Sequence, residues 1–405
     1  MPEPNLSQMF LRALRPRVSE MLAELRSLVE CESPSLEKGP ADRCCTLLAS
    51  KWHRRGARIE RIAQKHRGDH LRITWQPSGA RAKGQLMVLG HYDTVYGSGT
   101  LAKMPFRIKA GKAYGPGTFD MKGGLVQALF ALGALQALRV PLLKRIVFVW
   151  NSDEEIGSDS SRRLIESEAR RSDAVFVLEP SLGPRGLLKT ARKGVGEAEI
   201  IVHGRASHAG LAPQEGINAV HELAQQITRI ETWNDLPRGI SINADIIEGG
   251  TRTNVIAERA RAVLDMRALR ISDMRRIEKW LRDLHPLHRG AKIEIRGGFN
   301  RAPLERKVTG ALFARAKSLA AQMGLSLGES TAGGGSDGNL TGALGVPTLD
   351  GLGAVGDGAH SSHEHLIINM MPQRAALLAA LLASSRLSPR IFVRESRQAI
   401  GLYRT

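Results

Sequence analysis

The chain of 405 residues has little cysteine, few aromatic residues and no long apolar run. Its three cysteines, Cys31, Cys44 and Cys45, are too few and odd in number for a disulfide framework. The longest apolar stretch, Ala375–Ala383, falls far short of the ~20 residues that span a bilayer. The first residues also lack the continuous apolar core of a signal peptide. We therefore expect a cytoplasmic protein without a membrane partner.

Acidic residues are scarce relative to basic ones, because 40 aspartates and glutamates stand against 58 lysines and arginines. The formal charge of +18 raises the expectation of a nucleic acid or an anionic ligand. The basic residues are scattered, however, with denser patches only at Arg12–Arg17 and Lys51–Arg72. Aromatic residues, at 4%, offer few surfaces on which bases could stack. We interpret the charge as an arginine-rich solvated surface and expect no nucleic-acid partner, although an anionic substrate would benefit from it.

The length and the hydrophobic pattern predict two domains. In the first part of the chain, apolar runs alternate with helical stretches, and this alternation resumes after about residue 302. Gln85–Gly90, Arg145–Trp150 and Asp173–Leu178 are typical of buried strands, and Lys122–Leu138 is typical of a helix. The alternation predicts an α/β domain whose mostly parallel sheet is flanked by helices.

The middle of the chain follows a different order of elements. Strand, helix, strand, strand, helix and strand are expected at Gly196–Gly204, Pro213–Thr232, Gly239–Ile247, Ala260–Arg267, Ser272–His285 and Ala291–Gly297. This βαββαβ order is the split motif of a ferredoxin-like domain. We therefore expect a ferredoxin-like α+β lid at 194–302, inserted into a catalytic domain at 1–193 and 303–405.

Three of the predicted strands run directly into histidine or acidic residues. His91 and Asp93 follow the first strand, Glu154 and Glu155 the second, and Glu179 the third. Ligands bind at the carboxyl edge of open α/β sheets, where these side chains are expected to meet. Carboxylates gathered there would repel one another unless cations neutralised them. A mixed set of histidine and carboxylate suits zinc, manganese or cobalt better than calcium or magnesium, so the pattern predicts a divalent-metal site.

Several of these residues also allow interpretations without a metal. Asp120 lies in GPGTFDMKGG, a tight loop before a helix, where a lone aspartate is usually an N-cap but could bridge two metals. Glu154 and Glu155 could be a solvated acidic turn, or they could divide the roles of proton acceptor and metal ligand. Asp93 could orient the ring of His91 by a hydrogen bond, or the pair could belong to an incidental turn.

A last ligand is expected late in the chain, after the strand-like end PTLDGLG. The segment GAHSSHEH offers His360, His363 and His365. Such a tract can be a metal site or merely a polar loop, and the spacing alone does not select one histidine.

Taken together, these motifs resemble the co-catalytic zinc exopeptidases and deacylases. That family comprises glutamate carboxypeptidases, aminoacylases, acetylornithine deacetylases and succinyl-diaminopimelate desuccinylases. The likeness to bacterial glutamate carboxypeptidases is closest in SHAG, GGGSD and the GAH segment. The resemblance covers nearly the whole chain and rests on GHYDTV, GPGTFDMKGG, NSDEEIGS, VLEPS, GRASHAG, GGTRTNVI, LDMRA, TAGGGSD and GAHSSHE, in this order.

The resemblance implies two divalent metal ions, with zinc favoured over cobalt or manganese. His91 and Glu179 would hold one ion, and Glu155 and His360 the other. Asp120 would bridge them. His360 is the histidine that fits, because the family's last ligand is followed a few residues later by a glutamate.

It also implies roles for residues around the metals. Glu154 would be the general base and then the proton donor, while Asp93 would orient His91. The lid would form a homodimer, and His208 would reach the partner subunit's site to polarise the scissile carbonyl.

The substrate would be bound by further residues. Asn254 and Arg267 would contact its oxyanion or carboxylate, although Arg267 by itself would be interpreted as a surface charge on a strand. Gly334, Gly335 and Ser336 would form a loop near the substrate carboxylate.

The expected activity is hydrolysis of an amide or peptide bond in a small N-acyl amino acid or dipeptide-like substrate with a free carboxylate. Water activated by two metals would attack, with Glu154 as the base. An alternative within the family is an N-acyl-amino-acid deacetylase or aminoacylase. A more distant one is a catalytically inactive binding protein, which the complete ligand set and Glu154 disfavour.

Overall fold

The computed structural model describes residues 5–76 and 83–384, which divide into two compact units. The first unit contains the chain up to Thr190, Arg306–Thr331 and the chain from Ser336 onward. The second unit contains Ala191–Glu305 and Ala332–Gly335.

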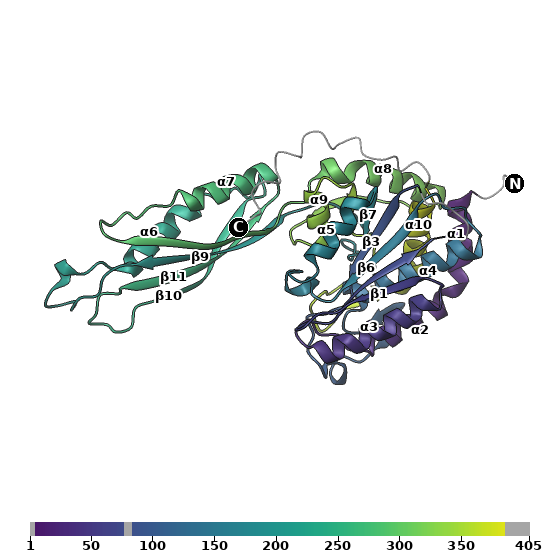
Figure 1. Ribbon diagram of the computed structural model, residues 1–405, viewed down its shortest axis with the longest axis horizontal. Helices are drawn as coiled ribbons and strands as arrows, with labels where there is room; N and C mark the ends of the chain where they lie inside the picture. The colour runs from purple at the N-terminus through teal and green to yellow at the C-terminus, as the bar shows by residue number, and fades with distance from the viewer. Residues whose placement is uncertain (1–4, 77–82, 385–405) are drawn as a thin grey trace. The chain divides into compact units, whose positions relative to one another are not determined.

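The first unit is built around a six-stranded sheet with helices on both faces (Figure 1). The strands lie in the order β1 (Arg58–Ile62), β2 (His70–Trp75), β6 (Arg145–Asn151), β3 (Gln85–His91), β7 (Ala174–Val177) and β14 (Thr348–Leu349). Neighbours from β6 to β14 are parallel, whereas β1 and β2 are antiparallel to their neighbours. The helices are α1 (Leu6–Leu14), α2 (Val18–Val29), α3 (Lys38–His53), α4 (Gly123–Ala137), α5 (Arg162–Arg171), α8 (Arg306–Gln322), α9 (Asp337–Ala343) and α10 (Met371–Ala383).

The continuous apolar sequence of β3 follows from burial on both of its faces. Leu86 and Val88 belong to the core shared with α4 and α10, whereas Met87 and Leu89 belong to the core shared with α5 and α9. Figure 1 shows these helix pairs on opposite sides of β3 and β7. Because β6, β3 and β7 are parallel, their carboxyl ends meet at one edge of the sheet. The predicted α/β architecture with a mostly parallel sheet is confirmed.

Two smaller sheets complete the strands. An antiparallel sheet has the order β15 (Gly356–Asp357), β16 (His365–Ile367), β5 (Lys112–Tyr114) and β4 (Arg107–Lys109). It places the histidine-rich segment next to the loop that leads to Asp120. A further pair is formed by β8 (Leu188–Arg192) and β13 (Glu329–Ala332).

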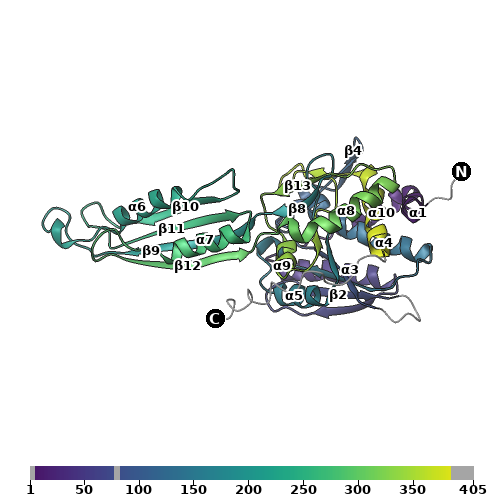
Figure 2. The same cartoon turned by 90° about the horizontal axis from the view of Figure 1, so that it is seen from above.

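The second unit is a ferredoxin-like domain, as predicted. Its antiparallel sheet has the order β10 (Ser241–Gly249), β11 (Arg259–Ala268), β9 (Gly194–His203) and β12 (Lys292–Arg301). The helices α6 (Ala219–Glu231) and α7 (Ile271–Arg282) pack on one face of it (Figure 2).

The helix expected from Pro213 begins six residues later, at Ala219. The side chain of Asn218 accepts hydrogen bonds from the amides of Val220 and His221, which makes it the N-cap. The residues Pro213–Glu215 form a separate short 3-10 turn. The helix therefore starts at its cap and not at the preceding proline.

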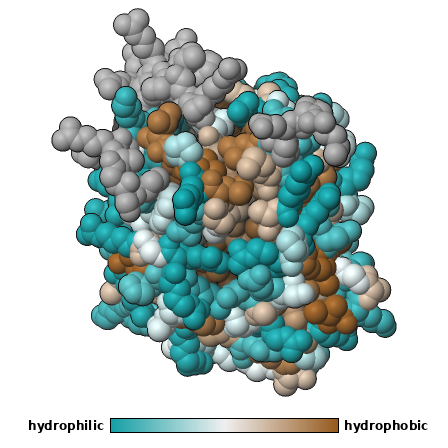
Figure 3. All heavy atoms as spheres, turned by 90° about the vertical axis from the view of Figure 1, so that its right-hand side faces the viewer, coloured by the Kyte–Doolittle hydropathy of each residue, from teal (hydrophilic) through white to brown (hydrophobic). Residues whose placement is uncertain are grey.

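The surface of the first unit mixes polar and apolar residues. On the face drawn in Figure 3, hydrophilic side chains alternate with smaller apolar areas. Among the helices of residues 5–76 and 83–384, none combines the length and the apolarity needed to cross a bilayer.

Asp69 links three segments at the edge of the first unit. Its buried carboxylate accepts hydrogen bonds from Lys38 Nζ at 2.7 Å, Arg61 Nε at 2.6 Å and the amide of Gln64 at 2.8 Å. Burial alone would raise the pKa of Asp69, but these three donors outweigh it and lower the pKa to about 2.

We predict that Asp69→Asn lowers the free energy of unfolding by about 2 kcal/mol near neutral pH. Because the folded-state pKa is depressed, this stability is present above the ordinary pKa of 3.8 and is lost as the pH falls toward about 2. Urea unfolding of both proteins at about pH 7 and about pH 3 measures the difference. Glu20→Gln, which removes an exposed ion pair with Arg17, serves as the control. An equal loss at both pH values would contradict the explanation.

Candidate metal centre

The predicted strand-end residues meet at the carboxyl edge of the main sheet. His91 is the last residue of β3, and Glu155 lies in a 3-10 turn just after β6. Glu179 follows β7, Asp120 lies in the loop before α4, and His360 lies in the turn between β15 and β16. All five side chains belong to the first unit.

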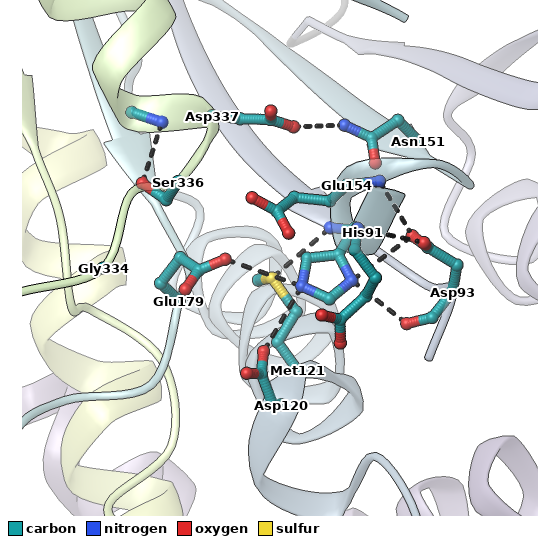
Figure 4. A network of polar contacts seen from close by, with 12 residues as sticks. His91, Asp93, Asp120, Met121, Asn151, Glu154, Glu179, Gly334, Ser336 and Asp337 are labelled. Atoms are coloured by element: carbon teal, nitrogen blue, oxygen red, sulfur yellow. Dashed lines mark hydrogen bonds and ion pairs between the residues drawn. The ribbon is translucent and has the colours of Figure 1, made fainter. Parts of the chain in front are cut away.

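These side chains form two clusters that share Asp120. In the His91 cluster, His91 Nε2 lies 3.3 Å from Asp120 Oδ1 and 3.5 Å from Glu179 Oε1. In the His360 cluster, His360 Nε2 lies 3.1 Å from Glu155 Oε2 and 3.6 Å from Asp120 Oδ2. Asp120 therefore turns one oxygen toward each histidine. Figure 4 shows Asp120 and Glu179 reaching toward the His91 ring from different elements.

The donors fit divalent ions in number, chemistry and spacing. His91 Nε2, Asp120 Oδ1 and Glu155 Oε1 are buried and have no hydrogen-bond partner, an expensive arrangement unless a cation occupies the space between them. Two ligands that bind one zinc ion tetrahedrally at about 2.1 Å lie about 3.4 Å apart. The four distances of 3.1–3.6 Å match that spacing.

The electrostatic field of the clusters favours positive charge. Burial lowers the pKa of His91, but its contacts with Asp120, Asp93 and Glu179 outweigh burial and raise it well above the usual value. Contacts with Asp120 and Glu155 raise the pKa of His360 to about 10. Burial also raises the pKa of Glu155, whereas the two histidines lower that of Asp120 despite its burial. A field that holds protons on two imidazoles would also attract divalent cations, which displace those protons on binding.

Asp93 connects the His91 cluster to the turn that carries Glu154 and Glu155. Its buried carboxylate accepts the amides of Glu154 and Glu155, each at 3.3 Å, and the hydroxyl of Ser35 at 2.7 Å. His91 Nδ1 lies 3.1 Å from the Asp93 carbonyl oxygen and 3.4 Å from its carboxylate. Both the carbonyl and the carboxylate of Asp93 thus face the Nδ1 side of the ring, so Asp93 is placed to orient His91.

A glycine permits the loop that carries Asp120. Gly117 has a φ of 72°, in the left-handed region, and a Cβ there would lie 2.8 Å from Thr94 Cγ2. The backbone of this loop can therefore approach Thr94 closely enough to point Asp120 into both clusters.

His208 and Asn254 lie together in the second unit. Their segments are joined by a hydrogen bond from the amide of Ala209 to the carbonyl of Asn254 at 2.9 Å. His208 Nδ1 accepts the amides of Gly210 and Leu211, both at 3.1 Å. Because Nδ1 acts as an acceptor, a neutral His208 ring carries its proton on Nε2. Both side chains are exposed.

Arg267 lies at the other end of the same sheet. Arg259 and Arg267 lie eight positions apart on β11. Arg259 pairs with His203 on β9, and the His208 loop follows His203 in the chain. At the rise of an antiparallel strand, this separation is roughly 26 Å. The guanidinium of Arg267 donates to Asp265 at 2.6–3.1 Å. Within the second unit, a small substrate therefore cannot contact both His208 and Arg267.

Two cationic residues near the site, Arg192 and Lys189, were not predicted from the sequence. The carbonyls of Gly334 and Gly335 accept hydrogen bonds from Arg192 Nη1 at 3.2 and 3.1 Å, so a positive charge accompanies this glycine loop. Lys189 Nζ lies 3.9 Å from Glu179 Oε2. Glu364 is bonded to the Asp120 loop. The sequence had singled out Glu364 only for its spacing from His360 and not for this contact.

The sequence profile described as Peptidase family M20/M25/M40 matches residues 87–384. Carboxypeptidase G2 of Pseudomonas sp. (strain RS-16) is 32% identical over 310 residues, which are 75% of this chain and 74% of that protein. Acetylornithine deacetylase of Myxococcus xanthus is 29% identical over 199 residues, which are 46% of this chain and 50% of that protein.

Solved structures share the fold. Aminopeptidase PepT from Bacillus cereus has a TM-score of 0.73 and 21% identity, with 90% of this chain and 98% of that chain covered. The YXEP protein of Bacillus subtilis, a dinuclear metal-binding peptidase, has a TM-score of 0.67 and 16% identity, with 92% and 98% covered. The profile match and the 32% identity confirm the resemblance seen in the sequence. The chain is a metallohydrolase that belongs to peptidase family M20/M25/M40.

Proposed function

We propose that the protein hydrolyses an amide or peptide bond in small N-acyl amino acids or dipeptide-like substrates that carry a free carboxylate. The proposal rests on the two clusters that share Asp120, with Glu154 next to Glu155 on one turn. Similarity to a carboxypeptidase over three quarters of the chain supports it. Similarity to an acetylornithine deacetylase favours a second candidate, an N-acyl-amino-acid deacetylase or aminoacylase.

The proposed ligands follow the two clusters. His91 and Glu179 hold one divalent ion, Glu155 and His360 hold the other, and Asp120 bridges them. We propose zinc for both ions, with cobalt or manganese as alternatives, because imidazole and carboxylate ligands suit all three. When bound, such an ion pair acidifies water and polarises a carbonyl group.

Glu154 is the proposed general base. Its amide is held by Asp93, its side chain is 9% exposed, and it is not part of either cluster. Figure 4 shows Glu154 beside the His91 ring, on a different element from Asp120 and Glu179. From there its carboxylate takes a proton from the attacking water and later gives it to the leaving nitrogen.

His208 is the proposed donor to the substrate carbonyl. The two amides at Nδ1 leave the proton of the neutral ring on Nε2, which can donate to a developing oxyanion. Asn254, on the adjoining segment, would contact the same end of the substrate, whereas Arg267 would bind a carboxylate elsewhere. Gly334 and Gly335 would lie near that carboxylate, with Arg192 supplying the positive charge.

The separation of His208 from Arg267 supports a homodimer. If both act on substrate, they must serve different sites, so His208 and Asn254 would complete the partner subunit's site. The edge strand β10 exposes Ile246 and Ile247 to the extent of 49% and 60%, which suits an interface between two copies. We therefore propose that residues 194–302 form a lid and dimerisation domain.

We predict that the purified protein binds two divalent ions per chain and hydrolyses amides only when they are bound. Metal analysis, followed by a screen of N-acetyl amino acids, acyl-glutamates and dipeptides, measures both. Release of a carboxyl-terminal amino acid from a peptide or acyl-glutamate would favour the carboxypeptidase, and preference for acetyl groups the deacetylase. Metal-stripped protein is the control. If the zinc-, cobalt- and manganese-loaded forms hydrolyse no amide, the proposed function is wrong.

We predict that Glu154→Gln retains both ions but lowers kcat by about 100- to 10,000-fold, because the proton acceptor is removed while the ligands stay. Steady-state kinetics and metal analysis of the same preparation test this. Asp159→Asn changes an exposed acid on the same loop and should keep wild-type kcat. Near-normal turnover by Glu154→Gln would overturn its role as base.

We predict that mixing the inactive variants Glu154→Gln and His208→Ala restores activity after subunit exchange. If His208 acts on the partner's site, half of the dimers contain one intact site, giving about a quarter of wild-type activity. A mixture of Glu154→Gln with His91→Ala is the control, because no dimer in it has an intact site. Absence of recovery in verified heterodimers would show that His208 does not act in the partner.

A further inference from the structure

The two histidines of the metal centre are held in different ways. The His91 side chain is 1% exposed and is fixed at the end of a central strand by contacts with Asp93. The His360 side chain is 50% exposed and lies on a turn outside the main sheet, with a φ of 61°. Packing therefore orients His91, whereas the orientation of His360 depends on how its turn is held.

That turn ends at a carboxylate buried beneath the Asp120 loop. Glu364 is fully buried, and its Oε1 accepts the amides of Phe119 at 2.8 Å and Asp120 at 2.9 Å. Its Oε2 accepts the amide of Gly117 at 3.0 Å. One side chain thus receives three backbone donors from the loop that presents the shared ligand.

Backbone contacts make the connection from Glu364 to His360 short. The amide of Glu364 donates to the carbonyl of Ser361 at 3.2 Å, and that of Ser361 donates to the carbonyl of Gly358 at 3.0 Å. Tyr96 Oη donates to the same Ser361 carbonyl at 3.0 Å. The residue next to His360 is therefore held from both sides, by Glu364 and by Tyr96.

We infer that Glu364 is a positioning residue that fixes the His360 turn to the Asp120 loop and so keeps the His360 cluster assembled. This rests on the proposed metal sites. The two clusters are supported differently, because the His91 cluster has its own support from Asp93 and β3. Loss of Glu364 should therefore affect mainly the ion held by Glu155 and His360.

Glu364→Gln tests this, because an amide cannot replace the carboxylate in these contacts. Whichever way it is turned, its NH₂ group faces a backbone N–H, so at least one donor of the loop loses its acceptor. We expect one of the two zinc ions to bind at least about 10-fold more weakly and the other to be nearly unchanged. Competition between metal-stripped protein and a chromophoric chelator for zinc measures both affinities.

Two variants calibrate the result. His360→Ala should abolish binding of the ion held by Glu155 and His360. The loss identifies which of the two affinities in the zinc competition belongs to that ion. Glu168→Gln is the matched control, since Glu168 is also a buried glutamate, bonded to Arg72 and Gln85 outside both clusters. It should bind both ions like the wild type, even if it is less stable.

Tyr96→Phe provides a second route that keeps Glu364 and its three bonds to the Asp120 loop. It removes the hydrogen bond to Ser361 and the contact of the Tyr96 hydroxyl with Glu364, and it should weaken the same ion by about 5-fold. If Glu364→Gln does not show the cooperative unfolding of a folded protein, Tyr96→Phe is the deciding variant. Unchanged zinc affinities in Tyr96→Phe would then overturn the inference. Equal weakening of both ions in Glu364→Gln would also overturn it. A wild type that binds no pair of ions would instead refute the proposed metal sites, a separate outcome.

Discussion

Mutual repulsion among carboxylates at one edge of the sheet constrains the first unit. Asp120, Glu155 and Glu179 lie within ion-pair distance of two imidazoles, and Asp120 Oδ1 and Glu155 Oε1 are buried without a hydrogen-bond partner. Such an arrangement of buried carboxylates destabilises the folded chain when no positive charge compensates it. The surrounding loops must therefore resist the repulsion until cations offset it, and their backbone amides are used for that purpose.

The supporting contacts follow one pattern, in which a buried acid receives donors from a neighbouring loop. Asp93 accepts two amides of the turn after β6, and Glu364 accepts three amides of the loop before α4. Asp337 accepts Asn151 and Ser158, on either side of the Glu154 turn. Charge-assisted bonds of this kind are stronger than neutral ones, so each fixes a ligand segment without occupying the ligand itself.

The sequence predicted the sheet and part of the metal centre for clear physical reasons. An apolar run buried on both faces, followed at once by His91 or Glu179, identifies a strand end and its edge. Spacing alone could not select His360 over His363, because neighbouring histidines in one turn have similar spacing. The family resemblance selected His360, and the structure places His360 in a cluster and His363 against Ser361. Lys189 and Arg192 act through contacts made only in the folded chain, which leave no periodicity in the sequence to detect.

The two cores that enclose β3 restrict insertions and deletions in this strand. Successive residues of this strand alternate between the cores, and the strand ends at His91. Inserting or deleting one residue would exchange the two sets of side chains and turn the imidazole away from Asp120. The register of β3 is thus specified both by packing and by chemistry. Length variation is consequently excluded from this strand and must be confined to the loops.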